Sequence, residues 1–229
     1  MKWCKVVAQS NQQLRWAEPA QLLAFAYIDF LLVKRLRAVA THSQFDIFFI
    51  YQEETKENKT VGKLIYGTQT GTTVAVAEAI QKQLADLVSE IKCIDKASSA
   101  DFGDDFLVLG GSTWGDGELT DDWADFWPQM DNIDFAGKKV ALFALGDQVG
   151  YGYNFVSSMK FFYDKVTERG GSIIAYQITR DGFDFEHTEA LVDGYFVGLV
   201  IDEVNEPHLT DDRIALWAQE VRNALLVTA

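Results

Sequence analysis

The chain has 229 residues, of which 48% are hydrophobic and 13% aromatic, enough to build a sizeable globular core. Its formal net charge of −14 disfavours binding to nucleic acid and to anionic membrane surfaces, and favours docking to basic protein surfaces. The two cysteines, Cys4 and Cys93, are too few and too far apart for a disulfide framework or a metal-ligand spacing.

The first 59 residues differ in charge from the rest of the chain. Residues 1–60 carry eight Lys or Arg against six Asp or Glu, so almost all of the negative charge falls after them. The apolar run Leu22–Val33 is too short, and too interrupted by Asp29, for stable membrane insertion. Three interpretations stay open: an upstream-extended gene model, a weak interfacial amphipathic helix, or an atypical targeting segment. We predict an extension without a recognised domain over 1–59 and one domain over 60–229.

From Val61 onward, short apolar runs alternate with segments of helical period. This alternation is typical of βαβ units, and it predicts an α/β fold with a mainly parallel sheet of five strands and helices on both faces. The predicted strands are Lys63–Tyr66, Ile91–Ile94, Phe106–Leu109, Val140–Leu145 and Ile173–Tyr176, with a late run Phe196–Ile201 that would split the last strand. The predicted helices are Thr73–Leu87, Thr120–Met130, Phe155–Arg169 and Asp211–Leu226.

The loop after the first strand is rich in hydroxyl groups. It contains Thr68, Thr70, Gly71, Thr72 and Thr73 just before a predicted helix. Unpaired N–H groups and the helix dipole favour an anion at that place, so the loop predicts a phosphate site. Because it lacks the Gly-Lys-Ser/Thr run of a nucleotide triphosphate loop and the three spaced glycines of a dinucleotide site, the phosphate would be held and not transferred. A threonine-rich helix cap is the alternative.

Two later loops carry aromatic residues among glycines. Trp114 lies in the loop after the third strand, and Tyr151 and Tyr153 lie in the loop after the fourth. Ligands of parallel sheets bind beyond the carboxyl ends of the strands, so these loops should meet the hydroxyl-rich loop in space. Two aromatic faces from separate loops can enclose a planar ring, although a loop tryptophan can also be a packing lid.

Residues 61–229 resemble the long-chain flavodoxin family in three ordered motifs. The Thr-x-Thr-Gly-x-Thr motif is present at Thr68–Thr73, the Thr-Trp…Gly-Glu-Leu motif at Thr113–Leu119, and the Gly-Asp-Gln…Gly-Tyr motif at Gly146–Tyr151. The resemblance implies a flavodoxin-like doubly wound sheet with strand order 2-1-3-4-5, helices on both faces and an insertion in the last strand. Residues 1–59 have no counterpart in the family.

The same resemblance implies FMN as the cofactor, with its phosphate at Thr68–Thr73 and its ring system between Trp114 and Tyr151. Tyr153 is the competing stacking residue, and Asp147 and Asn154 would contact the flavin edge or ribityl chain. No catalytic residue and no metal is implied, and the expected FMN-binding residues are Thr68, Gln69, Thr70, Gly71, Thr72, Thr73, Ser112, Thr113, Trp114, Gly115, Asp116, Gly117, Gly146, Asp147, Tyr151 and Asn154.

Three positions depart from the family pattern. Ser112 stands where many relatives have proline, Thr72 where a lysine is common, and Val204 where some relatives have an acidic residue. We expect the first two to alter FMN affinity slightly and none to remove the site. We also hypothesise that the Gly115–Asp116 peptide turns over on reduction, because glycine tolerates both orientations.

The resemblance implies a low-potential one-electron carrier, not an enzyme, that cycles between the neutral semiquinone and the anionic hydroquinone of FMN. Its expected partners are a ferredoxin/flavodoxin-NADP+ reductase or other redox proteins with basic docking surfaces. We expect a monomer in the cytoplasm, or in an organelle stroma if residues 1–59 are a targeting segment. The alternative is an FMN-dependent NAD(P)H:quinone or azo reductase of the same fold, which would need open space over the flavin.

Overall fold

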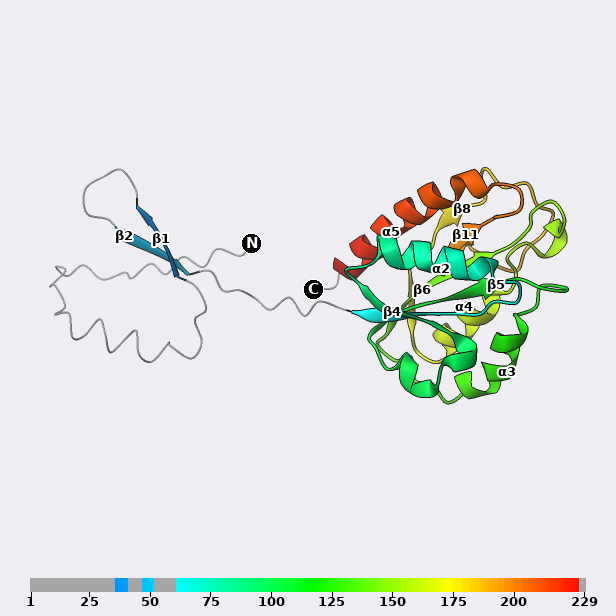
Figure 1. The fold of residues 1–229 in the computed structure, drawn as a ribbon, viewed down its shortest axis with the longest axis horizontal. Helices are drawn as coiled ribbons and strands as arrows, with labels where there is room; N and C mark the ends of the chain where they lie inside the picture. The colour runs from blue at the N-terminus through cyan, green and yellow to red at the C-terminus, as the bar shows by residue number, and fades with distance from the viewer. Residues whose placement is uncertain (1–35, 41–46, 52–60, 227–229) are drawn as a thin grey trace. The chain divides into compact units, whose positions relative to one another are not determined.

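The structure is a computed structural model that describes residues 36–40, 47–51 and 61–226. Contacts between Cα atoms divide the chain into two units, Met1–Asn58 and Lys59–Ala229, which are described separately (Figure 1). The assignment of residues 1–59 as an extension and of residues 60–229 as one domain stays a prediction. Among the described residues, no helix is both long enough and apolar enough to cross a membrane.

In the first unit, the described residues form two short strands. β1 (Leu36–Ala40) pairs antiparallel with β2 (Ile47–Tyr51), and Leu36 lies opposite Tyr51. The apolar run at 22–33 lies outside the described residues.

The second unit is built on one parallel sheet. Its strands are β4 (Val88–Cys93), β3 (Gly62–Tyr66), β5 (Phe106–Ser112) and β6 (Lys139–Leu145), in that spatial order, followed by β7 (Ser172–Ile174) and β11 (Leu199–Ile201), which both pair with β6. Every pairing in this sheet is parallel. With β7 and β11 counted as one split strand, the order is 2-1-3-4-5, which confirms the predicted fold class.

The insertion that splits the last strand forms a small sheet of its own. β7 pairs with Lys139–Ala141 of β6, whereas β11 pairs with Phe143–Leu145 farther along the same strand. The chain between them forms an antiparallel sheet in the order β8 (Ile178–Thr179), β10 (Tyr195–Phe196) and β9 (Leu191–Val192). The predicted insertion in the last strand is therefore confirmed.

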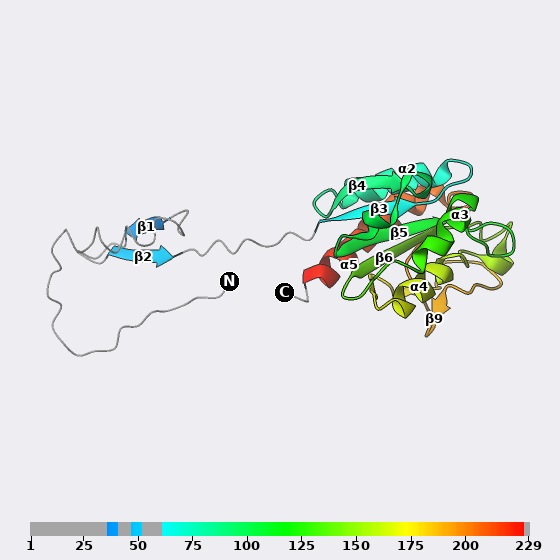
Figure 2. The same ribbon diagram turned by 90° about the horizontal axis from the view of Figure 1, so that it is seen from below.

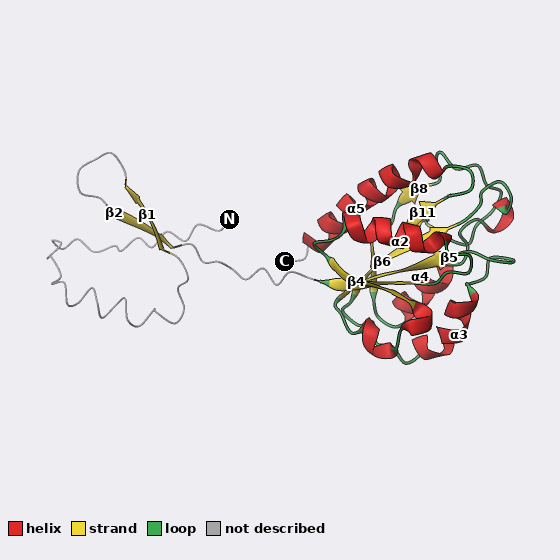
Figure 3. Ribbon diagram, in the orientation of Figure 1, coloured by secondary structure: helices red, strands yellow, loops and turns green. Residues whose placement is uncertain are grey.

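Helices cover both faces of the parallel sheet (Figures 2 and 3). Side chains of α2 (Thr72–Gln83) and α5 (Thr210–Leu226) belong to one buried cluster, and those of α3 (Asp121–Met130) and α4 (Met159–Glu168) belong to another. Four short 3-10 helices complete the unit: η1 (Ile94–Lys96), η2 (Ser99–Phe102), η3 (Gly152–Asn154) and η4 (Pro207–Leu209).

Alternate residues of β3 pack into the two buried clusters on opposite faces of the sheet. Leu64 and Tyr66 pack in the cluster with α2 and α5, and Ile65 packs in the cluster with α3 and α4. Successive side chains of a strand point to opposite faces, so a strand buried on both faces must be apolar throughout. This requirement explains why the central strands β5 and β6 read as nearly continuous apolar runs in the sequence.

The order of the strands indicates at which edge of the sheet, that of the amino or that of the carboxyl ends of the strands, a ligand would bind. β3 lies between β4 and β5, so the chain runs from β3 to β4 on one side and then crosses to β5 on the other. A ligand crevice is therefore expected beyond the carboxyl ends of β3 and β5. At the amino edge the chain enters β3 at Gly62, and α5 ends close to the start of β6, where Lys139 Nζ donates to the Ala224 carbonyl at 3.2 Å. The ends of the described unit thus lie at the edge opposite to the expected crevice.

Candidate functional site

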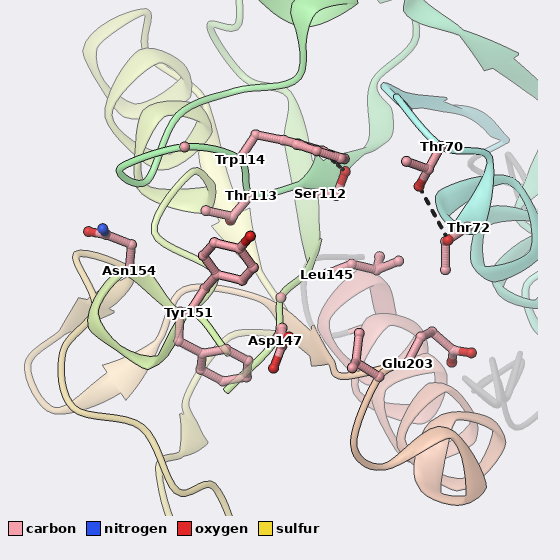
Figure 4. A pocket seen from close by; sticks show the side chains of 14 residues that line it. Thr70, Thr72, Ser112, Thr113, Trp114, Leu145, Asp147, Tyr151, Asn154 and Glu203 are labelled. Atoms are coloured by element: carbon pink, nitrogen blue, oxygen red, sulfur yellow. Dashed lines mark hydrogen bonds between the residues drawn. The ribbon is translucent and has the colours of Figure 1, made fainter. Parts of the chain in front are cut away.

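A cavity of about 380 Å³ opens at the carboxyl edge of the sheet. Figure 4 shows Trp114 and Tyr151 reaching it from two different loops, with Thr70 and Thr72 at the end opposite to Asn154. The lining residues are Thr70, Thr72, Ser112, Thr113, Trp114, Gly115, Leu145, Gly146, Asp147, Tyr151, Asn154, Phe155, Glu203 and Val204.

The hydroxyl end of the cavity lies at the N-terminus of α2. Thr72 is the first residue of that helix, and its Oγ1 lies 3.5 Å from Oγ1 of Thr70. Gly71 precedes it with φ of +93°, a left-handed conformation that carries the chain from the loop into the helix. Two hydroxyls therefore stand beside the unpaired N–H groups of a 12-residue helix, an arrangement suited to an anion.

Other residues of the hydroxyl-rich loop hold the loop itself in shape. The Thr68 amide donates to Asp122 Oδ2 at 2.8 Å, and Gln69 Nε2 donates to Asp121 Oδ2 at 2.9 Å, so the start of α3 anchors the loop. The Thr68 hydroxyl accepts from the Gly71 amide at 3.1 Å. Thr68, Gln69 and Gly71 are not among the residues that line the cavity, and neither is Thr73, which is buried.

The first aromatic wall comes from the loop after β5. The Trp114 indole N–H donates to the Ser112 hydroxyl at 2.8 Å, which fixes the ring next to the strand end. The Trp114 and Glu118 backbones pair with each other, closing a short turn that contains Asp116 and Gly117. Asp116 and Gly117 are not among the lining residues.

Thr113 ties this first wall to the start of α4. Its Oγ1 shares a hydrogen bond of 2.8 Å with the Ser158 hydroxyl. The Ser158 amide also donates to Thr113 Oγ1, at 3.3 Å. Thr113, which lies between Ser112 and Trp114 in the sequence, is therefore held in place by a residue outside its own loop.

The second aromatic wall comes from the loop after β6. Of its two tyrosines, Tyr151 lines the cavity, whereas the Tyr153 ring packs against the His187 ring with centroids 5.5 Å apart. Tyr151 is 68% exposed, so most of its ring remains accessible to a ligand or partner. The structure thus brings Tyr151, and not the competing Tyr153, to the cavity that Trp114 lines.

Asp147 shapes the loop that carries Tyr151. Its Oδ1 accepts from the Val149 amide at 3.1 Å, the Gly150 amide at 2.7 Å and Asn205 Nδ2 at 2.8 Å. Burial alone would raise the pKa of this carboxyl, but the hydrogen bonds from Gly150, Asn205 and Val149 outweigh burial and lower it. The Asp147 carboxylate therefore stays ionised and puts a fixed negative charge in the cavity wall.

Four lining residues were not among the expected FMN-binding residues: Leu145, Phe155, Glu203 and Val204, of which Val204 had been noted only as a departure from the family pattern. Glu203 and Val204 follow β11 and form a wall that the three predicted loops do not include. A signal for them existed, because β11 runs parallel to β6 and its carboxyl end must reach the same edge of the sheet.

Comparison with known proteins gives one consistent result. Residues 64–217 match the family model described as Flavodoxin. The chain is 41% identical to a flavodoxin of Nostoc sp. over 167 residues, which cover 72% of this chain and 97% of that protein. It is 44% identical to a flavodoxin of Synechocystis sp. over 164 residues, which cover 71% of this chain and 96% of that protein.

A solved structure agrees with these relatives. The flavodoxin of Fusobacterium nucleatum, solved bound to flavin mononucleotide, superimposes with a TM-score of 0.67 at 30% identity. The match covers 71% of this chain and 97% of that one. Sequence and structure comparisons therefore place the same share of the chain in the same family.

Proposed function

The chain belongs to the flavodoxin family, and from this premise we propose that it is a low-potential one-electron carrier that cycles between the neutral semiquinone and the anionic hydroquinone of FMN. It is an electron-transfer protein rather than an enzyme, and FMN is its cofactor. The observation that carries the proposal is the cavity itself, which joins a helix N-terminus lined by hydroxyls to two aromatic side chains from separate loops.

The residues of the cavity fit FMN. We propose that the phosphate binds at the N-terminus of α2 with Thr70 and Thr72, and that Trp114 and Tyr151 flank the ring system. Stacking adds about 0.5–1.5 kcal/mol per aromatic contact beyond the area buried. Gln69 and Thr73 would support the phosphate through their backbone amides, and Thr68 and Gly71 through the hydrogen bond between them that shapes the loop. Asn154 would contact the flavin edge or the ribityl chain.

Bound FMN supplies the capacity to accept and release electrons one at a time. The chain's contribution is to set the energy of each step. Asp147 and Glu203 both line the cavity, and a carboxylate opposes any added negative charge nearby, most strongly where protein excludes water. The two carboxylates therefore disfavour addition of the second electron and favour its release, as a strongly reducing carrier requires.

The test is a visible spectrum of the purified full-length protein during stepwise anaerobic reduction, with the released cofactor identified by mass spectrometry. We expect FMN, and an abundant one-electron-reduced form at intermediate potentials. Direct two-electron reduction, together with NADPH oxidation in the absence of a protein partner, would favour the quinone or azo reductase alternative. Absence of flavin after reconstitution with FMN would overturn the proposal.

We propose that the carrier docks to basic redox proteins such as a ferredoxin/flavodoxin-NADP+ reductase, as a cytoplasmic monomer. The net charge of −14 supports docking through long-range attraction. Raising the salt concentration from about 0.01 M to about 1 M shortens the screening length from about 30 Å to about 3 Å. We expect the association rate with such a reductase, measured by stopped flow, to fall steeply over this range. A rate that does not depend on salt would contradict docking by charge.

A further inference from the structure

A single side chain connects two walls of the cavity. Asn205 lies just beyond β11, and its Nδ2 donates to Asp147 Oδ1 at 2.8 Å, in the loop after β6. The same Nδ2 lies 3.1 Å from Asp202 Oδ1 and 2.9 Å from Asp202 Oδ2. One amide group therefore bridges two carboxylates from two loops.

Asp202 anchors this connection. It is fully buried, and its carboxylate accepts from the backbone amides of Gln148 at 3.1 Å, Val204 at 3.0 Å and Asn205 at 2.9 Å. Within the described part of the chain, its hydrogen-bond donors are all neutral N–H groups. A buried carboxylate without a cation depends on such donors, and losing one is costly.

The other charged groups around Asn205 do not replace its role. Glu203 and Glu206 lie on the same loop, and Glu206 is paired with Arg213 of α5 at 2.7 Å. The Glu203 carboxylate accepts from the Thr210 hydroxyl. From the insertion, the Asp184 amide donates to Gln148 Oε1 at 2.6 Å. The surroundings of Asn205 are thus mainly acidic, and its neutral amide supplies donors without adding charge.

We propose that Asn205 is a positioning residue. Its amide clamps the loop after β6, which contains Asp147 and Tyr151, to the loop after β11, which contains Asp202, Glu203 and Val204. The clamp fixes the distance between two walls of the cavity. The clamp is a property of the protein alone. Only its consequence for FMN affinity rests on the proposed function.

Three variants of the full-length chain separate the donors from the shape of the side chain. Asn205→Leu keeps the volume and removes the donors, Asn205→Asp replaces the donors with a third carboxylate, and Asn205→Gln keeps an amide on a longer stem. The matched control is Asn132→Asp, the same change on an exposed loop outside the cavity.

The first readout is amide hydrogen exchange of Gln148 and Gly150 in the protein without FMN, each variant compared with wild type at the same pH. Loss of a hydrogen bond to a charged group predicts exchange at least about tenfold faster in Asn205→Leu, at every pH. In Asn205→Asp the acceleration should be largest near pH 8 and shrink towards pH 5. The pKa of the new carboxyl would be raised by its acidic neighbours, so on acidification it becomes neutral and can donate again. Asn205→Gln should keep part of the protection.

The second readout is the Kd for FMN, which we expect to rise about tenfold in Asn205→Leu and Asn205→Asp and to stay at the wild-type value in Asn132→Asp. Wild-type exchange in both Asn205→Leu and Asn205→Asp would overturn the clamp. So would an effect of Asn205→Asp that does not vary with pH, or equal losses in the Gln and Leu variants, since a purely steric role predicts both. If wild type binds no FMN while exchange follows the predicted pattern, the clamp stands and the proposed function fails.

Discussion

Gly115 has a backbone conformation that side chains rarely adopt. Its φ is +50°, and a Cβ built on it would lie 2.6 Å from Glu118 Oε2. Glycine adopts both signs of φ at little cost, whereas other residues pay about 1–2 kcal/mol for the left-handed region. The position is therefore suited to a peptide that must take two orientations, as we hypothesise for the peptide between Gly115 and Asp116.

We predict that Gly115→Val lowers the yield of the one-electron-reduced form severalfold, because the branched side chain restricts the peptide to one orientation. The measurement is the amplitude of the intermediate spectrum in an anaerobic titration. Gly137→Val is the matched control, since Gly137 has φ of +76° and open space around its Cβ position. Both variants should lose about 1–2 kcal/mol of stability. Equal yields of the one-electron-reduced form in the two variants would rule out the proposed turn of the Gly115–Asp116 peptide.

Single residues show where prediction from sequence succeeds and where it fails. Thr70, Thr72, Trp114 and Tyr151 line the cavity as their residue types suggested. Thr68 and Gln69 instead bond to the acidic residues that begin α3, more than fifty positions away. A hydroxyl or amide beside a glycine indicates a polar loop, but only the folded chain decides whether its partner is a ligand or another part of the protein.

At the scale of elements, a cluster of charges ties η2 to the edge of the sheet. The Asp101 carboxylate of η2 accepts from Lys92 of β4 at 2.7 Å and from Lys63 of β3 at 3.5 Å. It also accepts from the Ser98 amide at 2.9 Å. The hydrogen bond from Lys92 is the largest influence on the pKa of Asp101 and, with Ser98, holds that pKa well below its usual range although burial opposes it.

This lowered pKa predicts a pH-dependent contribution to stability. A carboxyl with a lower pKa in the folded state stabilises the protein fully above its unfolded pKa, about 3.9, and loses the effect as the pH falls through the folded pKa. Asp101→Asn should therefore lower the free energy of unfolding at pH 7, and the difference from wild type should narrow below about pH 4. Urea unfolding at several pH values measures this, with the exposed Asp105→Asn as control. A difference that is constant with pH would show that the ion cluster is not its cause.

Element types were easier to predict than element ends. The second strand begins at Val88 and not at Ile91, because Ser89 and Glu90 lie at a sheet edge where polar residues are tolerated. The helix predicted to reach Leu87 ends at Gln83. The split of the last strand is visible in the sequence as two apolar runs. Glu203 and Val204 are harder to predict, because the segment after β11 lacks the glycines and aromatic residues that mark the other loops.

At the scale of the whole molecule, we predict that a chain starting at Thr60 folds and binds FMN with the affinity of the full-length protein. All fourteen residues that line the cavity fall between Thr70 and Val204. Isothermal titration of both chains with FMN measures this, and thermal unfolding of both reports on folding. Weaker binding by the shorter chain would assign residues 1–59 a part in the site and would contradict the proposed domain boundary.

The two ends of the described unit lie at the edge of the sheet opposite to the cavity, and this has a practical consequence. Gly62 enters at the amino edge of the sheet and Ala224 lies beside the start of β6, while the cavity opens beyond the strands' carboxyl ends. A linker attached at either end of this unit would leave the aromatic opening facing away from the attachment point. If this unit were fixed to an electrode through a linker at the end of α5, its redox face would point to the solution. Current would then flow through a soluble mediator or partner and not by direct contact with the electrode surface.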